Sequence, residues 1–238
     1  MGKKVLILRN TPRENPGIIE DLLKECNIDY QIIDFDSSIE IRPVQQYNAL
    51  VVLGGPESAN DTSEKMLCEL AFIREAVNHK IPYLGICLGM QTLVKAMGGE
   101  IMKCHEAETG FRDKNGEIYN VELTEAGKND RLFDGLPGSF DVFQLHGETI
   151  KLTDGMQLLG KSESCRNQIV RVGETAYGVQ AHFELNDSLL ESWITEDPDL
   201  KKLDSNTLRS DFNLLKSVYM ETGRQLFANF LEIAGLLT

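Results

Sequence analysis

The sequence has no excess of basic residues and no long hydrophobic run. Its 238 residues include 24 Lys+Arg against 37 Asp+Glu, which gives a formal net charge of −13 at pH 7 and an isoelectric point near 4.8. Such a surface is unsuited to neutralising phosphates, so we expect no nucleic-acid partner. No stretch approaches the roughly 18 apolar residues of a membrane span, and Val5–Leu8 is too short for a signal-peptide core. We therefore expect a cytoplasmic protein with no membrane attachment.

The five cysteines are too scattered for a disulfide framework. They stand at positions 26, 68, 87, 104 and 165, with no Cys-x-x-Cys pair and no histidine at zinc-ligand spacing, so the sequence predicts no metal site. We expect most of them, Cys26 and Cys68 in particular, to be small buried apolar residues. Cys87 differs because of its neighbours.

The first half of the chain alternates short β-branched runs with longer helical patterns. The run Ala49–Leu53 is nearly all apolar, as in a parallel strand covered on both faces. With 42% hydrophobic residues the chain can bury a substantial core. We predict a single α/β domain, flavodoxin-like, with a mostly parallel sheet and helices on both faces. Strands are expected at 5–8, 31–34, 49–53 and 81–86, and helices at 18–26, 65–78 and 89–97.

The second half has a different pattern. Alternation across Glu117–Thr124, among frequent glycines, indicates antiparallel strands and turns added to the sheet. Later strands are expected at 143–145, 169–172 and 177–180. From Asp187 onward the apolar spacing is helical. We predict a domain over residues 1–185 and a C-terminal helical extension, 186–238, that packs on the same domain; a homodimer face or a lid over the site are the alternatives.

The segment Pro82–Gln91 carries the strongest chemical signal. An expected strand ends at Cys87, with Gly85 and Gly89 two residues to either side and a helix directly after it. A tight strand-to-helix turn lifts its side chain away from the sheet, and the glycines relieve the crowding. The N-terminus of the following helix favours the thiolate. The pattern predicts a nucleophile elbow, with a buried structural cysteine as the alternative.

Two other segments supply what a cysteine nucleophile needs. Gly54-Gly55-Pro56 follows an expected strand, and such a turn can present backbone N–H groups to a developing negative charge. His182 lies on the expected strand that starts at Tyr177, and Glu184 shares its face if the strand extends that far. The carboxylate then orients the imidazole that serves the thiol. We predict a catalytic set of Cys87, His182 and Glu184.

These segments resemble the class I, or triad, glutamine amidotransferases. Gly85-Ile-Cys-Leu-Gly-Met-Gln91 is similar to the family's Gly-x-Cys-x-Gly-x-Gln motif, Gly54-Gly55-Pro56 to its oxyanion turn, and 178–184 to its His-x-Glu strand. The likeness covers roughly residues 4–185. Three shorter segments, Asn15-Pro-Gly-Ile, 143–148 and 164–168, are similar to stand-alone GMP-synthase-like members.

The resemblance implies a glutaminase in which Cys87 attacks the side-chain amide and His182 passes a proton to the departing ammonia. It implies that the oxyanion is held by the backbone N–H groups of Gly55 and Leu88. It also implies substrate contacts from Gln91 and from a loop at Leu145, His146 and Gly147. Phe183 stands where the family usually has proline, so we expect a looser backbone or a differently covered pocket.

Motifs that would consume ammonia are missing from the sequence. It has no Gly-x-x-x-x-Gly-Lys-Ser/Thr loop and no Ser-Gly-Gly-x-Asp-Ser loop, and no cofactor is expected. Either a separate synthase subunit takes the ammonia, or the chain hydrolyses a γ-glutamyl compound by the same chemistry. A catalytically inert regulatory subunit is a third interpretation.

Overall fold

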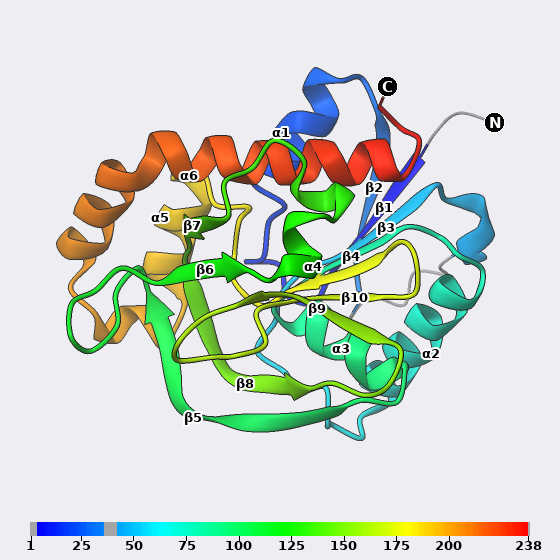
Figure 1. The fold of residues 1–238 in the computed structure, drawn as a ribbon, viewed down its shortest axis with the longest axis horizontal. Helices are drawn as coiled ribbons and strands as arrows, with labels where there is room; N and C mark the ends of the chain where they lie inside the picture. The colour runs from blue at the N-terminus through cyan, green and yellow to red at the C-terminus, as the bar shows by residue number, and fades with distance from the viewer. Residues whose placement is uncertain (1–3, 36–41, 238) are drawn as a thin grey trace.

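A nine-stranded sheet runs through the computed structural model, which describes residues 4–35 and 42–237 (Figure 1). Its strand order is β2-β1-β3-β4-β11-β10-β9-β6-β7. The first five strands in this order are parallel, and the other pairings are antiparallel. The parallel strands are β1 (Lys4–Arg9), β2 (Asp29–Asp34), β3 (Ala49–Val52), β4 (Tyr83–Ile86) and β11 (Ala176–Val179). The antiparallel strands are β6 (Asn120–Leu123), β7 (Ser139–Asp141), β9 (Met156–Lys161) and β10 (Ile169–Val172).

Helices cover both faces of this sheet, because successive side chains of a strand point to opposite faces. Val5 and Ile7 of β1 belong to an apolar cluster with α1 (Ile18–Glu25) and α6 (Ser205–Ile233). Leu6 and Leu8 belong to a cluster on the other face, with α2 (Glu64–Asn78) and α3 (Leu88–Ala96). The predicted α/β architecture is confirmed.

Smaller elements complete the described chain. The helices α4 (Glu125–Lys128) and α5 (Asp187–Glu196) are short, and there are 3-10 turns η1 (Val44–Gln46), η2 (Arg131–Phe133) and η3 (Leu200–Lys202). The helix α6 packs along α1, so residues of the predicted extension contact the sheet domain. The domain boundary between residues 185 and 186 remains a prediction, and so does the alternative that these helices form a homodimer face. Within the described ranges, every helix is too short or too polar to traverse a lipid bilayer.

A separate two-stranded ribbon pairs β5 (Glu100–Gly110) with β8 (Gln144–Lys151). The sequence analysis did not predict β5, because few side chains of this strand are buried and the strand therefore lacks an apolar alternation. The strand β9 was not predicted for a similar reason. The expected loop at residues 145–147 is wrong, since Leu145, His146 and Gly147 lie within β8 and pair with β5.

Candidate functional site

Cys87 lies at the turn between β4 and α3, at the carboxyl edge of the parallel strands. It is the N-cap residue of α3 and has a positive φ of 52°, a backbone strain of the order of 1–3 kcal/mol for a residue with a side chain. Its N–H donates to Val179 O (2.8 Å) and ties the turn to β11. A Cβ on Gly85 would lie 2.2 Å from Gly89 O, and one on Gly89 would lie 2.1 Å from Val52 O. Only glycine therefore fits at these two positions.

The Cys87 thiol opens on a pocket of about 410 Å³, a size suited to a small-molecule ligand. The residue is 6% exposed. Its Sγ lies 3.6 Å from Leu145 O, which can accept the thiol proton, and 3.6 Å from Nε2 of Gln180. Cys87 is therefore buried and also lines a cavity, as a nucleophile in a closed site would. The pocket is also lined by Gly55, Leu88, Gln91, Leu145, His146, Gly147 and His182.

His182 and Glu184 form a short hydrogen-bonded pair, with Nδ1 2.6 Å from Oε1. The strand β11 ends at Val179, so strand alternation does not bring them together. The isolated bridge between Phe143 and His182 instead fixes the backbone at His182, with His182 N–H donating to Phe143 O (2.9 Å). Both side chains are about 2% exposed.

The electrostatics of the pair favour a charged imidazole. Burial lowers the pKa of His182, but the Glu184 carboxylate and the Cys87 sulfur outweigh it and hold that pKa well above its usual value. The other ring nitrogen, Nε2, is buried and has no partner of hydrogen-bonding geometry among the described residues. This nitrogen is therefore free to exchange a proton within the pocket.

The C-terminal helices hold the histidine in place. The Trp193 ring, on α5, packs edge-to-face with the His182 ring at a centroid distance of 4.7 Å. The Tyr219 hydroxyl, on α6, donates to His182 O (2.7 Å). Both aromatic residues are at most 2% exposed, so the imidazole is set in a rigid apolar frame.

Backbone contacts from the N-terminal motif and from Phe183 fix Glu184. Ile18 N–H donates to Glu184 O (2.8 Å), and a Cβ on Gly17 would lie 1.9 Å from that oxygen. Phe183 N–H donates to Glu184 Oε2 (2.8 Å), a bond that proline could not make. Its ring is buried against Phe140 at 5.4 Å. Phe183 does not line the pocket, so the expectation that it covers the pocket is wrong.

The predicted oxyanion donors lie on the pocket wall beside Cys87. Leu88 is the first residue of α3, so its N–H has no acceptor within the helix. Gly55 follows β3, and a Cβ there would lie 2.7 Å from the Cβ of Asn10. The two residues therefore line the same pocket, Gly55 from the segment after β3 and Leu88 from the start of α3.

The predicted substrate-binding residues are partly engaged with the protein itself. Gln91 Nε2 donates to Glu148 O (3.0 Å) and to Gln180 Oε1 (3.2 Å). His146 Nε2 lies 2.8 Å from Glu108 Oε2, and its Nδ1 lies 3.0 Å from Glu148 O. Both ring nitrogens of His146 therefore contact oxygen atoms of the protein.

Sequence reasoning missed six charged residues of the pocket: Arg13, Glu14, Glu57, Glu148, Asp197 and Asp199. Arg13 pairs with Asp197, Nη2 to Oδ2 2.8 Å. Burial raises the pKa of Glu14 to about 7, and the neighbouring charge of His182 opposes the rise. Glu14 directly precedes the motif at residues 15–18, and this position could have identified it as a site residue. Nothing in the sequence around Asp197 indicated that it lies at the pocket.

Comparison with known proteins bears on what this site is. Residues 16–197 match the family model of the class I glutamine amidotransferases. A structure of a glutamine amidotransferase from Thermotoga maritima superposes with a TM-score of 0.86 and 28% identity, covering 98% of this chain and 99% of that one. The whole fold, with its C-terminal helices, is therefore shared.

Two curated relatives carry GMP synthase names. A glutamine-hydrolysing GMP synthase of Thermosipho melanesiensis is 35% identical over 214 residues, which cover 88% of this chain and 38% of that protein. One subunit of the glutamine-hydrolysing GMP synthase of Methanococcus maripaludis is 28% identical over 185 residues, 76% of this chain and 88% of that subunit. The chain thus spans well under half of the first relative but most of the second. The match over residues 16–197 places the chain in the class I glutamine amidotransferase family, within its GMP-synthase-like group.

Proposed function

We propose that the chain hydrolyses the side-chain amide of glutamine through a thioester on Cys87 and delivers the ammonia to a separate synthase. The observation that supports this most is the convergence on one pocket of the Cys87 thiol and the His182–Glu184 pair. A nucleophile, a base and a group that orients the base are what amide hydrolysis by a thiol requires.

The first half of the reaction forms the thioester. His182 holds the thiol proton on Nε2 as an imidazolium, so Sγ attacks the amide carbon as a thiolate and the carbonyl oxygen becomes an oxyanion. The N–H groups of Gly55 and Leu88 stabilise that oxyanion, each contributing about 3 kcal/mol in the transition state. The intermediate collapses as the imidazolium protonates the amide nitrogen, the C–N bond breaks, and ammonia leaves.

The second half regenerates the enzyme. A water molecule gives a proton to His182 and attacks the thioester carbon, the C–S bond breaks, and the imidazolium returns its proton to the sulfur as glutamate leaves. Glu184 holds the imidazole in orientation throughout and stabilises its charged form. Gln91 and the backbone of residues 145–147 bind the rest of the substrate.

The separate synthase is suggested by a relative that is itself named as a subunit of glutamine-hydrolysing GMP synthase, and the match covers 88% of that subunit. By analogy with that subunit, these residues would supply the glutaminase part, and a second polypeptide would consume the ammonia.

The test is release of glutamate and ammonia from glutamine, with a panel of γ-glutamyl peptides in parallel. We expect Cys87→Ala and His182→Ala to abolish turnover and Glu184→Gln to reduce it less. A glutamine-mimicking diazoketone should label Cys87 in preference to Cys68, which is exposed. Faster turnover of γ-glutamyl peptides than of glutamine would favour the hydrolase. No Cys87-dependent turnover, with or without a synthase partner, would refute the proposal and favour an inert regulatory role.

A further inference from the structure

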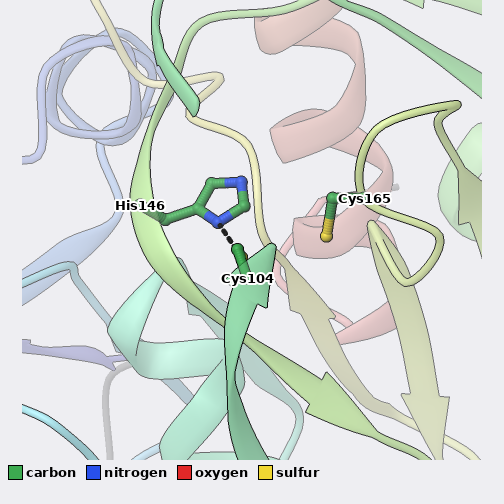
Figure 2. A group of neighbouring side chains, drawn as sticks. All are labelled: Cys104, His146 and Cys165. Atoms are coloured by element: carbon green, nitrogen blue, oxygen red, sulfur yellow. Dashed lines mark hydrogen bonds between the residues drawn. The ribbon is translucent and has the colours of Figure 1, made fainter. Parts of the chain in front are cut away.

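Three side chains with metal-binding atoms meet behind the wall of the pocket. Cys104 comes from β5, His146 from β8 and Cys165 from the connection between β9 and β10, and Figure 2 shows them gathered in one place. Cys104 and Cys165 are 61 positions apart in the sequence. One ligand atom from each of the three lies within 4.8 Å of the others, and only Cys104 is more than slightly exposed.

The spacing suits a tetrahedral ion bound by sulfur and nitrogen. Zinc–sulfur bonds of about 2.3 Å and zinc–nitrogen bonds of about 2.0 Å put neighbouring ligand atoms about 3.5–3.8 Å apart. The distance from Cys104 Sγ to His146 Nδ1 is 3.6 Å. The remaining separations are no longer than 4.8 Å, so side-chain shifts of about 1 Å would complete the geometry.

A buried carboxylate orients the histidine as metal-ligating histidines are usually oriented. Glu108 Oε2 lies 2.8 Å from His146 Nε2, and both side chains are at most 3% exposed. A proton on Nε2 leaves the lone pair of Nδ1 available to an ion, and Cys104 Sγ lies 3.6 Å from this nitrogen. Metal coordination would replace the 3.0 Å contact of Nδ1 with Glu148 O, and that carbonyl would keep its second donor, Gln91 Nε2.

The two cysteines are held by the local backbone. The register of β5 against β8 is interrupted between Lys103 and Glu108, and Cys104 lies in this interruption. Cys165 closes a tight turn, in which Ser162 Oγ accepts from Cys165 N–H (3.1 Å) and donates to Cys165 O (2.8 Å). The Thr149 hydroxyl lies 3.1 Å from Cys165 Sγ, where it can donate to a thiolate. The site is therefore largely formed before any ion arrives.

We propose that Cys104, His146 and Cys165 bind a Zn²⁺ ion through two thiolates and one imidazole, with a fourth position left for water. Zinc is the ion of choice because its common sites combine thiolate and imidazole ligands in tetrahedral geometry. The ion would join the β5–β8 ribbon to the β9–β10 connection. It would thereby brace Leu145, the neighbour of His146, whose carbonyl contacts the Cys87 thiol.

The test uses the full chain, reduced and freed of metal by chelation, and Co²⁺ as a spectroscopic probe of the zinc site. We expect one Co²⁺ per chain, with tetrahedral visible bands and a thiolate-to-metal charge-transfer band in the near ultraviolet, both removed by one equivalent of Zn²⁺. Cys104→Ser and Cys165→Ser should each abolish the charge-transfer band or weaken binding at least tenfold. Glu108→Gln should weaken binding about tenfold, as loss of a group that orients a ligand does.

Two matched variants separate this site from the other thiols. Cys68→Ser removes an exposed thiol and Cys87→Ser removes the pocket thiol, and both should leave the Co²⁺ spectrum unchanged. The proposal is overturned if the spectrum survives both Cys104→Ser and Cys165→Ser, or if it disappears only in Cys87→Ser. It is equally overturned if the reduced protein takes up no Co²⁺ or Zn²⁺ and oxidation simply joins the two cysteines in a disulfide.

Discussion

Replacing Glu69 by glutamine should make the protein markedly more stable at alkaline pH. Glu69 lies on α2 and is completely buried. Its Oε1 has one long hydrogen bond, from Asn10 Nδ2 at 3.4 Å, and its Oε2 has no partner among the described residues. Burial raises the pKa of Glu69 to about 7, against the opposing effects of Asn10 and of the Lys65 charge.

The sign and size of the effect follow from proton linkage. The folded protein keeps this proton to about pH 7, whereas the unfolded chain releases it near pH 4.5. Stability must therefore fall as the pH rises between these two values, because the unfolded state binds fewer protons there. At about 1.4 kcal/mol for each pH unit, the full loss above pH 7 is about 3 kcal/mol.

The assay is urea unfolding of the native protein and of Glu69→Gln between about pH 4 and pH 8. The difference in unfolding free energy should grow by about 3 kcal/mol in favour of glutamine across this range. Glu14, whose pKa is also raised to about 7, is present in both proteins and cancels. Glu75→Gln, an exposed position of the same helix, is the control. A difference for Glu69→Gln that stays flat or shrinks with rising pH would refute the reasoning.

Three further predictions concern the site. Glu14 ionises near pH 7 beside the His182 imidazole, and its negative charge should stabilise the imidazolium. We therefore expect kcat/KM to rise through pH 7 in the native protein and to rise less in Glu14→Gln. An unchanged pH profile in this variant would count against this role of Glu14. Phe183→Pro should lower both kcat and stability, the latter by about 3 kcal/mol, because it removes a buried ring and the 2.8 Å donor to Glu184 Oε2. Phe183→Leu keeps the N–H and should retain more of the kcat, so equal loss in the two variants would contradict the contribution of this bond. Gly85→Ala should lower the free energy of unfolding by about 3 kcal/mol, because the new Cβ would lie 2.2 Å from a carbonyl oxygen of α3. The control is Gly138→Ala, where the nearest atom to the new Cβ would be 3.7 Å away. Similar losses of stability in the two variants, measured by urea unfolding, would show that crowding is not the cause.

The cysteines mark where inference from the sequence failed. Cys68 is exposed, so its assignment as a buried apolar residue is wrong, whereas Cys26 is partly buried and packs against the apolar core. Sequence spacing also gave no sign that Cys104 and Cys165 lie near His146. Zinc motifs are recognised by ligands close together in the chain, whereas here the ligands come from three strands or connections that meet only in the folded protein.

The sequence by itself determined the parallel core, because β-branched runs and helical apolar spacing are local patterns that depend on a few neighbouring residues. It also determined the turn at Cys87, since glycine at positions 85 and 89 is required by contacts within a few residues and with the adjoining strand. Only the tertiary structure decided how His182 meets Glu184: β11 ends early, and pairing with Phe143 sets the backbone. The tertiary structure likewise decided which charged residues line the pocket, since Asp197 pairs with Arg13 across 184 positions of sequence. Local patterns report the forces between neighbours in the chain, but the pairing of distant segments depends on how the whole core packs.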